Sequence, residues 1–175
     1  MTLALLADLL TLARGVTALW LIWLGVARGA DALPLAVMVT LGAWLTDMLD
    51  GPLGRRAGGN TRLGHYDFVI DVMLTWASLI YLTLSGFIPM AVTAIYTLIA
   101  GVLVVIFQRK AVMVLMMRPV DITCGVVVLT RAFEEGIVFT AVLAGVAWLN
   151  RRRLREGIPR WLRELGEIFG LSRRR

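Results

Sequence analysis

The chain has 175 residues, of which 59% are hydrophobic and 17% are charged, and its mean hydropathy is +0.80. A soluble globular domain is less apolar than this, so the composition excludes that class and indicates a membrane protein. The formal net charge is +6, and the single cysteine, Cys124, excludes a disulfide within the chain.

Six apolar segments are predicted to form membrane-spanning helices. Each approaches the roughly 20 residues that cross the hydrocarbon core, and lipid offers no partner to unpaired backbone groups, which favours helices over strands. The segments cover residues 12–28, 32–53, 64–86, 88–107, 111–130 and 133–150. Before them, the apolar start "MTLALLADLLTLARG" is broken by Asp8 and Arg14 and is predicted to be an interfacial lead-in.

The last 25 residues, 151–175, are predicted to form a basic amphipathic tail, because Trp161, Leu165 and Phe169 recur at helical spacing among arginines and glutamates. Anchoring to anionic lipid and simple enforcement of topology both stay open as its role. The sequence thus predicts an all-α membrane protein, with a six-helix transmembrane domain over 1–150 and a cytoplasmic tail over 151–175.

The basic residues are distributed unevenly between the predicted connections. They concentrate in the second connection, in the fourth and in the tail, whereas only Arg28 and Arg131 lie at the alternate turns. By the positive-inside rule, both termini and the even-numbered connections face the cytoplasm of a bacterial-type cytoplasmic membrane. Because the charge follows from topology, nucleic acid is not an expected partner.

Four aspartates cluster in "TDMLDGPLGRRAGGNTRLGHYDFVID", residues 46–71, as the pairs Asp47/Asp50 and Asp67/Asp71. Spacings of i, i+3 and i, i+4 put each pair on one face of its helix. At the helical rise, Asp47 and Asp71 are each predicted about 10–12 Å from the connection, at matching depth in the cytoplasmic leaflet. An aspartate in the membrane costs about 2.5–3.5 kcal/mol on insertion scales, and a shared divalent cation would offset that cost. Oxygen-only ligands favour Mg²⁺, Mn²⁺ or Ca²⁺ over zinc.

A purely structural role and a transport role both account less well for these carboxylates. Helix capping and salt bridges to neighbouring arginines would suit a pair near the connection, but not the deeper Asp47 and Asp71. A divalent-cation or proton-coupled transporter would also place carboxylates in the membrane, but its polar path should reach both leaflets. Here the acidic residues cluster near one side, which favours a one-sided pocket open to the cytoplasm.

The pattern Asp47-x2-Asp50-Gly51-x2-Gly54-Arg55-x8-Gly64-x2-Asp67-x3-Asp71 resembles the signature of the CDP-alcohol phosphotransferase family, D-x2-D-G-x2-A-R-x8-G-x3-D-x3-D. The segment "LLTLAR", residues 9–14, is similar to the start of the family's first span. Gly54 replaces the usual alanine, and one residue fewer separates Gly64 from Asp67. On a helix that difference rotates the second pair by about 100° relative to Gly64.

The resemblance implies a six-helix membrane enzyme of phospholipid biosynthesis. In this family an alcohol attacks the β-phosphorus of a CDP-linked donor, typically CDP-diacylglycerol, and CMP leaves. The implied metal ligands, for Mg²⁺ or Mn²⁺, are Asp47, Asp50, Asp67 and Asp71, of which Asp71 is also the expected general base. The implied nucleotide-binding residues are Gly51, Arg55, Thr61 and Gly64. A homodimer is expected from the resemblance alone, and a family member that keeps the metal site without catalysis is the alternative.

A second basic group, Arg109, Lys110 and Arg118, lies on the cytoplasmic side of the fourth and fifth predicted spans. It is a candidate to bind the phosphate of an acceptor such as glycerol 3-phosphate. The alternative is that Arg109 and Lys110 only follow the positive-inside rule, and that Arg118 pairs with Asp121 at i, i+3. The identity of the acceptor alcohol therefore stays open.

Overall fold

The computed structural model describes residues 3–56, 63 and 66–149, together with 151, 155, 158–159, 161–163 and 166 of the tail; the side chains of residues 47–56 are outside this description. The described part of the chain is all-helical and contains no strand. Its elements are α1 (Leu3–Arg28), the short 3-10 helix η1 (Gly29–Ala32), α2 (Leu33–Arg56), α3 (Asp67–Leu84), α4 (Met90–Phe107), α5 (Lys110–Arg131) and α6 (Phe133–Leu149).

Four stretches of the described chain are long and apolar enough to cross a membrane. They are Ala4–Thr46, which covers nearly all of α1 and the first part of α2, and the helices α3, α4 and α5. These stretches indicate a membrane protein, as the composition predicts. The count of six spans, the division at residue 150 and the amphipathic tail stay predictions.

The start of the chain differs from the predicted lead-in. Helix α1 runs without interruption for 26 residues, so no boundary separates an interfacial segment from the first span at residue 12. The two charged residues that suggest a break in the sequence are accommodated by other segments. Asp8 accepts a hydrogen bond from the backbone of Leu63, and Arg14 pairs with Asp67 and Asp71.

Helix α3 also begins later than predicted, at Asp67 rather than at residue 64, since Tyr66 lies in a turn before it. Asp71 therefore lies one turn, about 6 Å, from the start of its helix instead of 10–12 Å. The predicted distance of Asp71 from the start of its helix is thus too large, whereas its depth in the membrane stays a prediction. Asp67 stands in the first turn, where the helix dipole favours an anion.

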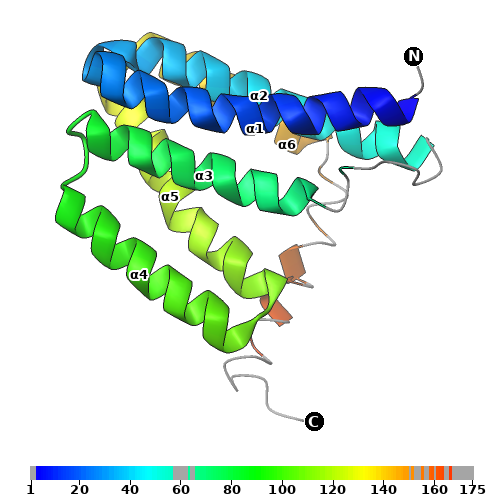
Figure 1. Cartoon of the computed structure of the whole chain (residues 1–175). Coiled ribbons are helices and arrows are strands. Elements are labelled where there is room, and N and C mark those ends of the chain that lie inside the picture. The colour runs from blue at the N-terminus through cyan, green and yellow to red at the C-terminus, as the bar shows by residue number, and fades with distance from the viewer. Residues whose placement is uncertain are drawn as a thin grey trace.

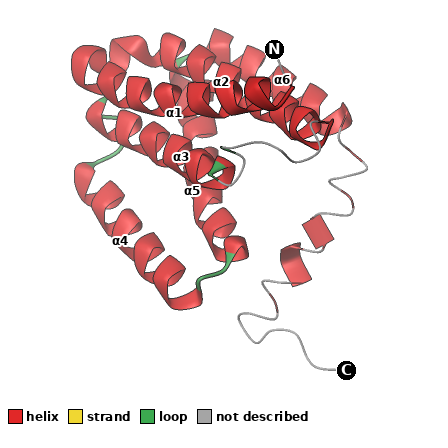
Figure 2. Cartoon of the chain, turned by 45° about the vertical axis from the view of Figure 1, so that its right-hand side comes forward, coloured by secondary structure: helices red, strands yellow, loops and turns green. Residues whose placement is uncertain are grey.

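The helices are arranged around α1, which packs against both α2 and α3 (Figure 1). Helix α3 packs in turn against α5, and α5 contacts α6 and α4. The core lies where the first three helices meet, and its most buried members include Ala18, Leu21, Leu24 and Leu82. Helix α4 lies at the edge of the bundle in both views, with most of its apolar side chains exposed, as suits a surface in lipid (Figure 2).

Close approach between helices depends on small residues at two points. A Cβ atom at Gly25 of α1 would lie 3.0 Å from the Leu84 Cβ of α3. At Gly136 of α6, an added Cβ would lie 3.1 Å from the Leu129 Cα of α5, so backbone and not only a flexible side chain stands in the way. Glycine at these positions lets neighbouring helices pack closely, as it commonly does in membrane bundles.

We predict that Gly136→Ala destabilises the bundle, because the added methyl group forces α6 away from α5. Overpacking of this kind costs about 1–3 kcal/mol. Gly145→Ala in the same helix is the matched control, since a Cβ there has no neighbour within 4 Å. Thermal unfolding in detergent should give a lower midpoint for Gly136→Ala than for Gly145→Ala. Equal midpoints would show that the close contact between Gly136 and Leu129 does not contribute to stability.

Candidate functional site

A buried arginine joins the first helix to the acidic start of the third. The Arg14 side chain is 0% exposed, while about a third of the Asp67 and Asp71 side chains is exposed, 33% and 30%. Arg14 Nη2 donates to Asp67 Oδ1, and Arg14 Nη1 donates to Asp71 Oδ1. The planar guanidinium suits this task, because its fixed fork of donors reaches two carboxylates at once. Because the i, i+4 spacing puts both aspartates on one face of α3, a single residue, Arg14, binds both of them.

Two other side chains of α1 support this arrangement. The Thr11 hydroxyl lies 3.1 Å from Asp67 Oδ1 and 3.2 Å from the carbonyl of Ala7, and it accepts a hydrogen bond from Arg14 Nη2 at 3.4 Å. One turn earlier, Asp8 Oδ1 accepts the backbone N–H of Leu63 at 2.9 Å. The first half of α1 thus fixes both the end of the second connection and the first turns of α3.

The predicted α2 half of the site is described only as backbone. Asp47, Asp50, Gly51 and Arg55 lie in the last turns of α2, on the side of the molecule where α3 begins (Figure 1). Their side chains lie outside the described residues, as do Thr61 and Gly64 altogether. Convergence of the two aspartate pairs therefore stays a prediction.

The three members of the second basic group, Arg109, Lys110 and Arg118, do not share one environment. The Lys110 ammonium lies 5.4 Å from the centre of the Phe68 ring, which places this cation beside the acidic first turn of α3. Arg109 precedes α5 as its N-cap residue and is exposed. Arg118 donates to Asp121 Oδ2 at 2.9 Å, which is the pairing considered as the alternative to acceptor binding.

The described carboxylates fit a hard divalent cation in chemistry and position. Asp67 and Asp71 offer only oxygen donors, lie one turn apart on one face, and are partly accessible. Within the described residues no group of three or more acidic, histidine or cysteine side chains occurs, so α3 supplies half of the predicted ligand set at most. The single charge of Arg14 offsets one of the two negative charges and leaves an excess for a cation.

Sequence reasoning from the acidic motif does not assign roles to Arg14, Thr11 or Asp8. Their signal is present, because a charged residue within a transmembrane segment is expensive and usually functional. In the sequence Arg14 looks like an interruption of an apolar run, since nothing local to α1 offers it a partner. Its partners, Asp67 and Asp71, lie 53 and 57 residues further along the chain.

We predict that Arg14→Met destabilises the protein, because it keeps side-chain length but leaves two partly buried carboxylates without their cation. Breaking a buried ion pair costs about 3–5 kcal/mol, and partial exposure of the aspartates places the loss near the lower end. Arg131→Met is the matched control, since Arg131 is exposed at the end of α5. The measurement is the midpoint of thermal unfolding in detergent.

A double variant separates charge from packing. If the pairing matters, Arg14→Met with Asp67→Asn should recover part of the loss, because one uncompensated charge is removed. A loss no larger than that of Arg131→Met, or the absence of any recovery, would contradict the role of Arg14.

Among known protein families, one matches the chain. The family model of CDP-alcohol phosphatidyltransferase matches residues 4–162, nearly the whole chain. Neither the curated proteins nor the solved structures provide a match. The matched range includes Arg14 in α1, and it also includes both aspartate pairs. The chain therefore belongs to the CDP-alcohol phosphatidyltransferase family, whose members transfer a phospho-alcohol group from a CDP-alcohol.

Proposed function

We propose that this protein transfers a phosphatidyl group from CDP-diacylglycerol to a small alcohol, with release of CMP, as a step of phospholipid biosynthesis. The observation that carries the proposal is the pair of carboxylates held side by side on α3 by Arg14, within the residues that the family model matches. A structural role alone would not require two carboxylates for one arginine.

The residues take distinct roles in the proposed reaction. Asp47, Asp50, Asp67 and Asp71 hold the metal. One or two Mg²⁺ or Mn²⁺ ions held by these residues would supply positive charge to offset the negative charge that develops on the departing CMP. The glycine at position 51 lets the backbone approach the nucleotide. The nucleotide is further bound by Arg55, Thr61 and Gly64.

Asp71 is the proposed general base. The oxygen of the alcohol forms a bond to the β-phosphorus while the bond from that phosphorus to the oxygen of CMP breaks. The alcohol proton passes to the Asp71 carboxylate, and CMP leaves with the bonding electron pair. Arg14 acts on this step as a positioning residue, because it holds the Asp71 carboxylate in place through Oδ1.

The proposed site opens to the cytoplasm. The start of α3 and the start of α5 lie on the same side of the bundle, and the latter carries Arg109 and Lys110 (Figure 1). Basic residues concentrate on the cytoplasmic side of membrane proteins, so this side is assigned to the cytoplasm.

We predict that Asp71→Asn lowers CMP release by at least about 100-fold while largely retaining donor binding, because a general base contributes about 10²–10⁴ in rate. Release of labelled CMP from CDP-diacylglycerol, with Mg²⁺ or Mn²⁺ and an acceptor mixture, is the measurement. Chelation of divalent ions should abolish it, and either ion should restore it.

Asp31→Asn is the matched control, since Asp31 is exposed in η1, away from the site. Its CMP release should equal that of the unaltered protein. Near-normal turnover in Asp71→Asn would overturn the assignment of the base. Failure of the unaltered protein to release CMP with any acceptor would favour a family member without catalysis.

A further inference from the structure

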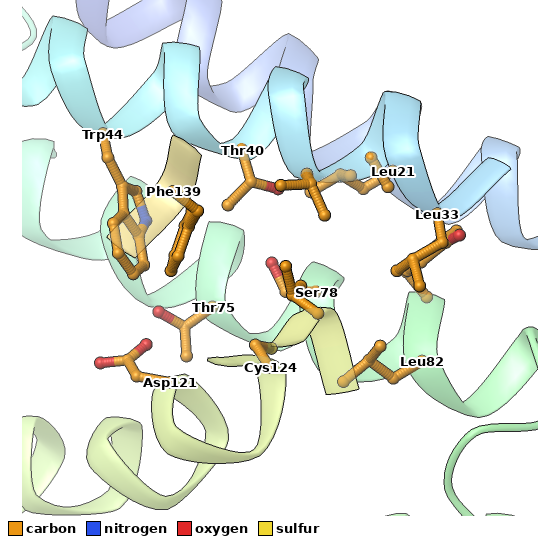
Figure 3. A pocket seen from close by; sticks show the side chains of 14 residues that line it. Leu21, Leu33, Thr40, Trp44, Thr75, Ser78, Leu82, Asp121, Cys124 and Phe139 are labelled. Carbon is orange, nitrogen blue, oxygen red and sulfur yellow. The ribbon is translucent and has the colours of Figure 1, made fainter. Parts of the chain in front are cut away.

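A cavity lies between α2, α3, α5 and α6, and Thr75, one helical turn after Asp71, is among its lining residues (Figure 3). Its volume is about 50 Å³. Asp121, Thr75, Trp44 and Phe139 surround one end, and the opposite end is closed by leucines. At one water for each 10–15 Å³ or so, it holds roughly three to five waters, about the volume of a molecule the size of glycerol. It is too small for a lipid chain.

Two residues that line the cavity lie on the same face of α3 as the proposed general base. Asp71, Thr75 and Ser78 recur at i, i+4 and i+7, so they share one face of α3, and the latter two line the cavity. The Thr75 hydroxyl donates to the Asp71 carbonyl at 3.1 Å. The cavity therefore begins one helical turn, about 6 Å, below the carboxylate that would accept the alcohol proton. A small alcohol is long enough to span this interval.

The wall of the cavity is apolar apart from a few groups that can bond to a ligand. Thr40, Thr75 and Ser78 contribute hydroxyls, and Asp121 contributes a carboxylate. Thr75 and Ser78 donate to their own backbone and so offer acceptor lone pairs. Arg118 engages Asp121 only through Oδ2, so among the described residues Oδ1 is left for a donor in the cavity.

The charge of the lining decides the chemical class of the ligand. Asp121 is the only charged side chain among the fourteen lining residues, all of which are described, and Arg109, Lys110 and Arg118 are not among them. Arg118 approaches from the exposed side, with 58% of its side chain exposed. A phosphate ester in this cavity would meet the Asp121 carboxylate, and no cation lines the cavity to pair with the phosphate, since Arg118 lies outside the lining and already pairs with Asp121; this is strongly unfavourable. A hydroxyl or an ammonium group would instead donate to Asp121.

We propose that this cavity binds the acceptor, and that the acceptor is a small alcohol without phosphate that donates a second hydroxyl or an ammonium group to Asp121. The assignment rests on the proposed transferase function, since it names the acceptor of that reaction. The reacting hydroxyl points toward Asp71 and gives up its proton there, while the distal donor lies between Asp121 and Thr75.

Trp44 supplies a binding readout that does not need turnover, because its indole lines the cavity and contacts Phe139, with ring centroids 5.2 Å apart. We would titrate the full-length protein in detergent with glycerol, ethanolamine or glycerol 3-phosphate and record tryptophan fluorescence. Glycerol or ethanolamine should give a saturable change that is lost in Trp44→Phe. Glycerol 3-phosphate should give none at the same concentrations. The first two ligands separate the hydroxyl from the ammonium form of the distal donor.

Variants of the lining test the contacts. Asp121→Asn should weaken binding by at least about tenfold, because a hydrogen bond to a charged group is replaced by one to a neutral amide. Thr75→Val should weaken it about threefold or more. Thr130→Val is the matched control and should bind normally: its hydroxyl also donates to its own backbone, at 2.8 Å, but it is exposed on the far part of α5. Thermal unfolding of each variant shows that it is folded.

The outcomes separate the two proposals. Equal or better binding of glycerol 3-phosphate, an unchanged affinity in both folded lining variants, or no saturable signal with either unphosphorylated alcohol would overturn the cavity assignment. CMP release driven best by glycerol 3-phosphate would overturn it too, while supporting the transferase. Binding of glycerol or ethanolamine as described, without CMP release under any condition, would uphold the ligand class and contradict the transferase alone.

Discussion

The site depends on the ion pairs between one fully buried arginine and two carboxylates on another helix. Without Arg14, Asp67 and Asp71 would face each other in an apolar bundle as two like charges one helical turn apart. With it, both are fixed in position and the pair keeps a net negative charge. Such a pair is held in the fold and keeps the negative charge that the proposed metal would need.

The same contacts account for the position of α1 between α2 and α3, the two helices that carry the aspartate pairs. α1 packs along α2 and α3, so the side chains on its first half reach the start of α3 and the end of the second connection. Residues 8, 11 and 14 recur at i, i+3 and i+6 and so lie close to one face of this helix. The aspartates of α3 that would carry the chemistry are thus held by side chains of another helix.

Much of this could be predicted from the sequence. Apolar runs predict helices because lipid tolerates little else, and the described chain is helical along these runs; the aspartate spacing predicts the correct face on α3. The continuity of α1 and the late start of α3 could not be predicted, since both depend on contacts between residues more than fifty positions apart. The cavity could not be predicted either. Thr40, Thr75 and Asp121 are ordinary residues when taken singly, and only packing of α2, α3 and α5 brings them together.

The aspartates of α2 and those of α3 are proposed to hold the same metal. Electron paramagnetic resonance of Mn²⁺ bound to the purified protein tests it directly, by comparing Asp50→Asn, Asp67→Asn and the double variant. A shared site predicts that either single substitution weakens the same bound ion, and that the double variant loses little more than the worse of the two. Independent losses that add, or full Mn²⁺ binding in either single variant, would contradict the account.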